Sequence, residues 1–404
     1  MNKAQSNFAK IISYNFLGTF FDKFLILLIT LALTKFILPE DYARWGYFFQ
    51  FVLLTDAVLM NSTLGIFSRT FFLKKTDHIE IYQWKIFFGL ILISLLTFFY
   101  LFSIDLKFII IELGVFLSFI FYNYVCLFLR FSNQNKSFFA VSFFKLLIFS
   151  IIITVTIILN DMLEYNKILL SFFISHFVVI LPFINKIKVL NKKNDPSTSK
   201  EFFSLSTYGL SSGLINSLDK ILITFLGLSP SFFASYYFLV QIASIPNLFT
   251  EIIKKSLVPF MYSDYSSNSR LTNSTKKKVL KSLSVLLIIQ ISLPIITYLI
   301  FQKMNFINED YIAYPNIIIS IIIISISFNF WNIYHFVNPV IIFFKKTWIM
   351  TTSLLLSSSM FVFFIMFYRS ESLVVWAFGK AILFSLSLIL TLFIKKLSFS
   401  NEKN

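Results

Sequence analysis

The sequence predicts an all-α polytopic membrane protein with about 12 transmembrane helices in two parallel six-helix repeats. Hydrophobic residues make up 57% of the 404-residue chain and charged residues only 13%, whereas soluble domains carry about 25% charged residues. Long apolar runs recur along the chain, and lysine and arginine gather in the loops on one side of them. This composition excludes a soluble enzyme, a disordered chain and a disulfide-stapled secreted domain.

Twelve apolar segments are long enough to cross a bilayer. A spanning helix needs about 20 mostly apolar residues, and inside lipid a helix satisfies every backbone polar group of such a run. The predicted spans are residues 11–37, 45–68, 85–104, 108–129, 138–159, 167–185, 203–227, 232–259, 280–301, 312–342, 348–368 and 372–394. The connections are too short to fold as separate domains, so any function is expected to reside in the helical bundle.

The basic residues predict the orientation of these spans. A net charge of +16 would indicate nucleic-acid binding in a soluble protein. Here most lysines and arginines, including Lys145, fall in cytoplasmic loops or at cytoplasmic helix ends if the N-terminus is placed in the cytoplasm. This asymmetry follows the positive-inside rule. It predicts a multi-pass protein with both termini in the cytoplasm and no nucleic-acid partner.

A polar segment near the midpoint predicts the domain boundary. Residues 191–201 read NKKNDPSTSKE and interrupt the apolar spans. The predicted organisation is an N-terminal six-helix bundle over residues 1–190, a cytoplasmic linker over residues 191–201, and a C-terminal six-helix bundle over residues 202–404.

The first span of each half carries the same polar pattern. Asn15, Thr19 and Asp22-Lys23 in the first span match Ser212, Asn216 and Asp219-Lys220 in the seventh, with the same i, i+4, i+7 spacing. This spacing places the first three polar groups on one helix face. Both spans begin on the cytoplasmic side, so the halves are predicted to be parallel repeats, a plan that recurs in transporters.

Several of these segments resemble the polysaccharide (O-antigen type) flippases. The segments that carry the resemblance are residues 219–223 with Leu226-Gly227, residues 235–237, residues 38–42 with Gly46, and Leu129-Arg130 with Asn135-Lys136. These flippases belong to the multidrug/oligosaccharidyl-lipid/polysaccharide exporter superfamily, together with the multidrug and toxin extrusion (MATE) exporters. The resemblance therefore implies a MATE-like fold.

The resemblance also implies a function. It implies that the protein flips an undecaprenyl-diphosphate-linked oligosaccharide, an O-antigen or capsule repeat unit, across the bacterial cytoplasmic (inner) membrane by alternating access. The expected partners are this lipid-linked oligosaccharide, a coupling ion (H⁺ or Na⁺), and a neighbouring glycan polymerase and glycosyltransferases. No cofactor is expected.

Charged residues inside the spans are the candidate substrate site. A charge at the bilayer centre costs roughly 2.5–3.5 kcal/mol on insertion scales, so such residues are expected to be paired, hydrated or functional. Asp22-Lys23 and Asp219-Lys220 are adjacent pairs whose side chains diverge by about 100° on a helix, so each residue is expected to find its partner on another helix or in a cavity. They either line a cationic transport cavity or form the cross-half ion pairs Asp22–Lys220 and Asp219–Lys23.

Other charged residues extend this candidate site. Asp56 is a candidate proton or ion site. Arg69, Arg130 and Lys254, at cytoplasmic span ends, either anchor the topology or capture the diphosphate first. Glu112, Glu251 and Lys380 are expected to serve interhelix packing or to snorkel, and His335 is expected to be a satisfied buried histidine.

Two other functions fit the same architecture. One is an ion-coupled drug or metabolite exporter, and the other is a membrane glycan polymerase or acyltransferase. The short external connections argue against the second. No P-loop, dinucleotide-binding glycine pattern, HExxH or GxSxG motif occurs, and the single cysteine, Cys126, permits no disulfide. The protein is therefore expected not to be an enzyme.

Overall fold

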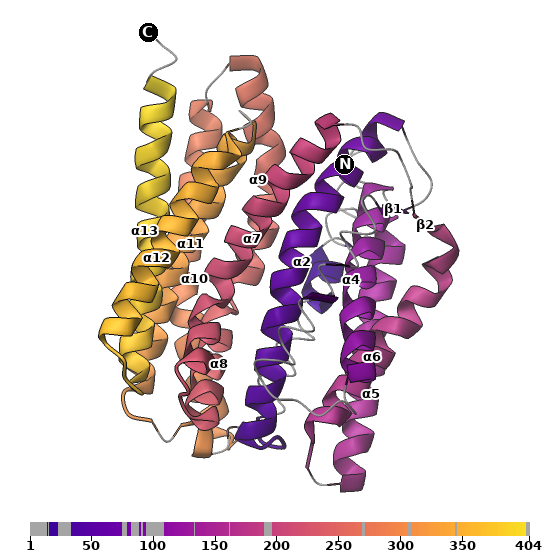
Figure 1. Ribbon diagram of the computed structural model, residues 1–404, viewed down its shortest axis with the longest axis vertical. Helices are drawn as coiled ribbons and strands as arrows, with labels where there is room; N and C mark the ends of the chain where they lie inside the picture. Colours follow the sequence, from indigo (N-terminus) through magenta and orange to yellow (C-terminus); the bar gives the residue numbers. More distant parts are fainter. Residues whose placement is uncertain are drawn as a thin grey trace, which may run out of the picture. The chain divides into compact units, whose positions relative to one another are not determined.

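The computed structural model describes residues 14, 16–22, 34–74, 79–81, 89, 92–93, 109–132, 134–160, 162–189, 196–268, 271–305, 307, 309–312, 314–343 and 346–400. Within these ranges the chain is mostly helical (Figure 1). It forms two compact units, Met1–Gly213 and Leu214–Asn404. This division lies further along the chain than the predicted linker (191–201), because helix α7 (Pro196–Phe225) already begins at Pro196 and continues across the boundary.

The N-terminal unit packs its helices around α6. Its other named helices are α2 (Pro39–Lys74), α4 (Ile109–Phe131) and α5 (Asn135–Asn160), and α6 spans Tyr165–Ile180, followed by the 3-10 turn η2 (Leu181–Lys186). Helix α6 contacts α2, α4 and α5. Aromatic rings fill this core, where Trp45 stacks on Phe49 at 5.1 Å and both rings lie against Phe172.

The C-terminal unit is built around α11. Its elements are α8 (Pro230–Ser244), α9 (Asn247–Asn268), α10 (Asn273–Lys303), η3 (Glu309–Tyr311), α11 (Ile317–Phe343), α12 (Thr347–Phe367) and α13 (Leu373–Ser400). Helix α11 contacts α8, α9, α10, α12 and α13, and α12 also packs on α13.

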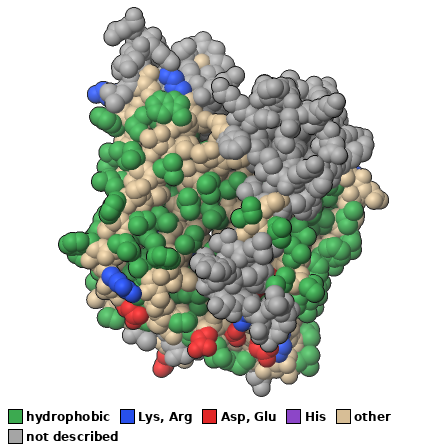
Figure 2. Space-filling model, viewed as in Figure 1, with side chains coloured by type: hydrophobic (Ala, Val, Ile, Leu, Met, Phe, Trp, Pro, Cys, Tyr) green, Lys and Arg blue, Asp and Glu red, His purple; other side chains and the backbone are tan. Residues whose placement is uncertain are grey.

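The described helices have the length and composition of membrane spans. Seven are long and apolar enough to cross a bilayer: Ile109–Arg130, Asn135–Asn160, Tyr165–Lys186, Asn273–Lys303, Ile317–Asn338, Thr347–Phe367 and Leu373–Lys396. Large hydrophobic side chains such as Phe363 and Phe367 are 77% and 82% exposed, as lipid-facing residues are. Figure 2 shows hydrophobic side chains along the C-terminal unit, with charged ones toward its ends. The chain is a multi-pass membrane protein. Most of the predicted spans 11–37 and 85–104 lies outside the described residues.

In the N-terminal unit, contacts between the connections that join the helices agree with the prediction that successive connections lie on alternate sides of the membrane. The residues before α2 and before α6 meet at one end, where Leu163 N donates to Phe36 O at 2.8 Å. Elsewhere, strand β1 (Ile79–Ile81), after α2, pairs in parallel with β2 (Ile187–Val189), after η2. This small sheet was not predicted, although the described chain is otherwise helical, as expected. Each strand is only three residues long, and the two pair because loops on the same side of a bundle satisfy each other's backbone groups.

In the C-terminal unit too, hydrogen bonds join residues that are predicted to lie on the same side of the membrane. Ser229, before α8, accepts or donates a hydrogen bond with the Tyr314 hydroxyl at 3.3 Å, and its backbone N–H donates to Glu371 at 3.3 Å. Ser229 and Glu371 belong to connections predicted on the external side, and Tyr314 lies at the external end of the predicted span 312–342. Lys346 Nζ donates to Ser398 O at 3.1 Å, which joins two segments predicted on the cytoplasmic side.

The predicted span 232–259 is broken into α8 and α9. Pro246 lies at the break and has no N–H to continue the helical ladder. Gln290 of α10 adds a contact at this break, because its side-chain amide donates to the carbonyl of Ala243, in the last turn of α8, at 2.6 Å. Asn332 of α11 in turn donates to Gln290 Oε1 at 3.1 Å, and both amide side chains are buried. The break is thus a built feature, held by polar groups from two neighbouring helices.

The polar connection between α9 and α10 is anchored at Asp264. The Thr272 backbone N–H and hydroxyl donate to its carboxylate at 2.9 and 2.8 Å. Hydrogen bonds from Thr275 and Thr272 hold the pKa of this carboxyl below its usual value. Thr272 also caps α10, because its hydroxyl accepts from Thr275 N.

Replacement of Gly227 should destabilise the end of α7. Gly227 has a φ of 67°, and its N–H donates to Thr224 O at 3.0 Å. No atom lies within 4 Å of an added Cβ, so the cost is purely conformational. We expect Gly227→Ala to lower the free energy of unfolding by about 1 kcal/mol, measured by denaturant unfolding of the purified protein. Gly227→Asn is the matched control, because asparagine tolerates this region better. Equal stability of Gly227→Ala and the unmodified protein would contradict the account.

Candidate functional site

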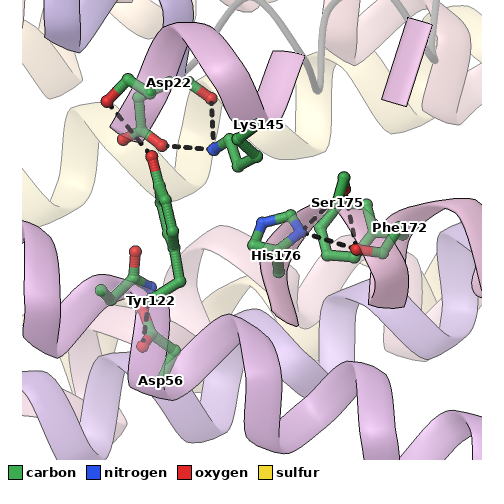
Figure 3. Close-up of polar contacts among 9 residues, drawn as sticks. Asp22, Asp56, Tyr122, Lys145, Phe172, Ser175 and His176 are labelled. Carbon is green, nitrogen blue, oxygen red and sulfur yellow. Dashed lines mark hydrogen bonds and ion pairs between the residues drawn. The ribbon is translucent and has the colours of Figure 1, made fainter. Parts of the chain in front are cut away.

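A buried ion pair in the N-terminal unit contains the predicted site residue Asp22. Lys145 Nζ of α5 lies 2.6 Å from Asp22 Oδ1 and also donates to the Asp22 backbone carbonyl at 3.3 Å (Figure 3). The Lys145 side chain is 2% exposed and that of Asp22 is 15% exposed. Lys145 was predicted to be a cytoplasmic helix-end cation, and this was wrong. It lies inside the apolar run 138–159, where its charge is stabilised by the carboxylate.

The second predicted acid, Asp56, approaches the same part of α4. Asn123 Nδ2 donates to Asp56 Oδ1 at 3.1 Å. The preceding residue, Tyr122, extends between Asp56 and Asp22, with its hydroxyl toward Asp22 (Figure 3). The Lys145 ammonium lies 4.0 Å from the centre of the Tyr122 ring, and the Tyr122 hydroxyl is 3.2 Å from Ser142 Oγ. Asp56 is thus bonded directly to α4 through Asn123, whereas Asp22 is linked to the neighbouring Tyr122 through Lys145, whose ammonium contacts both.

His176 completes this polar cluster, although the sequence analysis did not single it out. The imidazole of His176 is buried, stacks on Phe172 at 4.0 Å and meets the Tyr122 ring edge-on at 5.0 Å. Its Nδ1 lies 2.8 Å from Phe172 O (Figure 3), and its Nε2 has no hydrogen-bond partner among the described residues. A buried nitrogen without a partner is costly. The described residues contain no group of three His, Cys, Asp or Glu side chains able to hold a metal ion.

Glu112 serves interhelix packing, as predicted. Tyr165 of α6 donates to Glu112 Oε1 of α4 at 2.6 Å. The guanidinium of Arg44 lies 4.7 Å from the centre of the Tyr165 ring. These contacts join α2, α4 and α6 close to the external ends predicted for them.

Removing the Tyr165 hydroxyl should destabilise the N-terminal unit without removing its packing. Tyr165→Phe leaves the fully buried Glu112 carboxylate without this donor, so we expect a loss of about 1–3 kcal/mol in the free energy of unfolding. The measurement is thermal unfolding of the purified protein. Tyr14→Phe is the control, because Tyr14 is only partly buried. The role given to this hydrogen bond is wrong if the two variants are equally stable.

The C-terminal unit holds a second buried ion pair, at the predicted site residue Asp219. Lys380 Nζ of α13 lies 2.6 Å from Asp219 Oδ2, and the hydroxyl of Tyr236 donates to the same oxygen at 2.7 Å. The side chains of Asp219 and Lys380 are 0% and 1% exposed. Lys380 therefore serves interhelix packing rather than snorkelling to a surface.

Lys220 also reaches Asp219, contrary to the expectation for adjacent residues on a helix. Lys220 Nζ is 3.5 Å from Asp219 Oδ1 and donates to Asn216 O, one turn earlier. The long lysine side chain bends back along α7, which brings its ammonium beside its neighbour's carboxylate despite the divergence of the two Cβ directions. Asp219 is therefore neutralised within its own unit by two lysines.

The predicted cytoplasmic-end cations lie in different settings. The guanidinium of Arg130, in the last turn of α4, covers the Phe138 ring at 4.1 Å. Lys254 of α9 contacts His335 of α11, with 3.5 Å between Lys254 Nζ and His335 Nδ1. Arg69 lies in α2, but its side chain is outside the described part, as is all of Lys23.

Comparison with known proteins defines the fold class. No family model matches the sequence, and no curated protein matches it. Among solved structures, the chain is similar to an outward-facing multidrug resistance MATE transporter of the MOP superfamily (TM-score 0.64, 10% identity, 98% of this chain and 96% of that one). The chain thus has the fold of MATE-type membrane transporters.

Two further structures share this fold. One is the Vibrio cholerae MATE transporter VcmN, solved as a mutant, with a TM-score of 0.63 and 13% identity over 99% of both chains. The other is the lipid II flippase MurJ in an inward closed conformation, with a TM-score of 0.60 and 15% identity over 95% of this chain and 86% of that one. The fold is therefore shared by a drug transporter group and a lipid flippase.

Proposed function

We propose that this protein is a flippase of the multidrug/oligosaccharidyl-lipid/polysaccharide exporter superfamily. It moves an undecaprenyl-diphosphate-linked oligosaccharide, an O-antigen or capsule repeat unit, across the bacterial inner membrane by alternating access. Its twelve spans form two parallel six-helix repeats with both termini in the cytoplasm. The observation that carries the proposal is a charge-paired aspartate at the same position of the first span in each half, Asp22 and Asp219, within a fold shared with a lipid II flippase.

Each group of charged residues has a role in this proposal. Lysines and arginines attract the diphosphate as charge-assisted donors, a role that falls to Lys23, Arg69, Arg130, Lys220 and Lys254. Tyrosine and tryptophan rings stack on sugars and hydrogen-bond to them. The lipid tail stays in the bilayer while the head group crosses.

In this proposal an ion gradient drives export through the polar cluster of the N-terminal unit, which is formed by Asp22, Asp56, Tyr122, Lys145 and His176. Asp22 pairs with Lys145, whose ammonium also lies over the Tyr122 ring of α4, so a proton or Na⁺ arriving at Asp22 changes the charge beside Lys145. Asp56 is bonded to Asn123, the next residue of α4, and is the second candidate ion site. Release of Lys145 from Asp22 would free α5 from the first span. An intramembrane carboxylate that exchanges an ion in this way couples transport to the ion gradient.

Deletion of the gene tests the proposal. A strain without this protein, and without a redundant flippase, should lose surface glycan labelled with a radioactive sugar and accumulate the lipid-linked precursor. Complementation with the unmodified gene should restore export. Normal surface glycan in the deletion strain would contradict the proposed substrate.

A drug or metabolite exporter is the second candidate, favoured by the similarity to the MATE transporters. It predicts that the deletion strain becomes sensitive to small cationic compounds while its glycan is unchanged. The same strain therefore separates the two functions.

A further inference from the structure

Helices α9 and α11 carry a set of polar residues that we call the seam, in which Thr250 and Asn338 are buried and the others are partly buried: Asn247, Thr250 and Lys254 on α9, and His335 and Asn338 on α11. The three α9 residues lie at i, i+3 and i+7, so they share one helix face. The two helices pack along each other, and the contact between Lys254 and His335 fixes where their polar faces meet. All five residues fall within the predicted spans 232–259 and 312–342, where unpaired polar groups are expensive.

The seam contains several unsatisfied polar atoms. Neither Nδ2 nor Oδ1 of Asn338 has a hydrogen-bond partner in the described part of the chain, although the residue is only 2% exposed. The same holds for Thr250 Oγ1, in a residue that is 3% exposed, and for Asn247 Oδ1. Buried amides and hydroxyls are normally hydrogen-bonded, so these atoms are groups that a ligand can satisfy.

Lys254 is partly buried and has a different kind of partner from the buried lysines Lys145 and Lys380. Lys145 and Lys380 each contact an aspartate oxygen at 2.6 Å, whereas Lys254 contacts an imidazole nitrogen. An ammonium only donates, so His335 Nδ1 is the acceptor and the ring proton lies on Nε2. The carboxylate nearest along α9, Glu251, has an exposed side chain. The charge of Glu251 acts on both Lys254 and His335, and among the described contacts Lys254 Nζ makes one hydrogen bond, to His335, which leaves N–H groups that can donate to an anion.

We propose that this seam binds a diphosphate, with Lys254, His335 and Asn338 as its donors. The site rests on the proposed function, because the carrier lipid supplies this group, and it assigns to α11 a part of the substrate site. Asn338 lies one turn beyond His335, a rise of about 5 Å, so both residues are within reach of one diphosphate bound at Lys254. Trp331 stands 4.7 Å from His335 and provides a spectroscopic reporter of the bound state.

Calorimetry with the purified full-length protein tests the site. Inorganic pyrophosphate should bind to the unmodified protein and change the fluorescence contributed by Trp331, identified by difference with Trp331→Phe. Lys254→Met should weaken binding at least about tenfold, since it removes a charge-assisted donor. His335→Gln should weaken it less, and Asn338→Asp should weaken it strongly by charge repulsion while keeping the size of the side chain. Lys303→Met, an exposed lysine at the end of α10, is the matched control and should bind as the unmodified protein does.

The source of the diphosphate is tested with nanodiscs. Discs containing a polyprenyl diphosphate should compete with pyrophosphate, and discs containing phosphatidylglycerol, a monophosphate, should not. Equal competition by both lipids would overturn the diphosphate assignment. Absence of pyrophosphate binding, or equal binding by all seam variants with native melting temperatures, would overturn the site itself.

The result also separates the site from the proposed function. If the unmodified protein moves lipid-linked oligosaccharide and the seam variants move it equally well, the seam inference fails and the function stands. If the seam binds pyrophosphate in the pattern above but no lipid-linked oligosaccharide moves, the site stands and the proposed function fails.

Discussion

Asp219→Leu should lower the free energy of unfolding by about 3–5 kcal/mol, because it leaves the Lys380 ammonium buried without its carboxylate. Lys380 is 1% exposed and cannot reach water without rearrangement of α13. The measurement is denaturant unfolding of the purified protein in detergent, with the yield of folded protein from membranes as a second readout.

The double variant Asp219→Leu with Lys380→Leu is the control. Replacing a buried ion pair by apolar residues is often neutral, so the second substitution should recover part of the lost stability, and the remaining loss is that of Lys220, whose ammonium lies 3.5 Å from the same carboxylate. No recovery would show that the two charges do not act as a pair. Transport by the folded double variant then distinguishes two roles of the Asp219–Lys380 pair. If the variant folds but does not export, the pair is needed for transport. If the variant exports, the pair serves packing alone.

Asp22→Asn should reduce export at least about tenfold while the protein still reaches the membrane, because the amide keeps the shape of the side chain but cannot carry the charge that offsets Lys145. The measurement is surface glycan in a deletion strain complemented with the variant, normalised to the amount of protein in the membrane. This prediction rests on the partial exposure of Asp22, which is the more accessible member of the pair.

Glu164→Gln is the matched control for Asp22→Asn. Glu164 belongs to the same unit and pairs with Lys167 at 3.4 Å, but its side chain is 59% exposed, and such surface pairs contribute little. Its export should equal that of the unmodified protein. Equal export by both variants would remove Asp22 from the transport mechanism.

The sequence predicts a membrane protein and identifies charged residues within its spans. It does not identify which of these charged residues pair with each other. A lysine in an apolar run is visible from composition alone, and Lys380 was singled out on this basis. Its partner, Asp219, lies on α7, and the contact depends on how helices far apart in the sequence pack. Lys145 was assigned to a helix end because sequence position does not distinguish a snorkelling lysine from one turned into the bundle.

Local backbone features also divide into those that the sequence predicts and those that depend on tertiary packing. Pro246 marks a position where a helix is interrupted, because the missing N–H is a property of the residue itself. The hydrogen bond from the Gln290 amide to the last turn of α8 is set by tertiary packing and leaves no local pattern. The strands Ile79–Ile81 and Ile187–Val189 are too short to give an alternating pattern, so their pairing was absent from the prediction.

Reconstitution of the purified protein in liposomes tests the central claim most directly. A fluorescent polyprenyl-diphosphate oligosaccharide is placed in one leaflet, and its exposure to a quencher on the other side is followed with time. The account predicts that the lipid crosses faster in liposomes with the unmodified protein than in protein-free liposomes or in liposomes with Asp22→Asn. Crossing at the same rate in all three, with an ion gradient imposed in either direction, would contradict the assignment of this protein as a flippase.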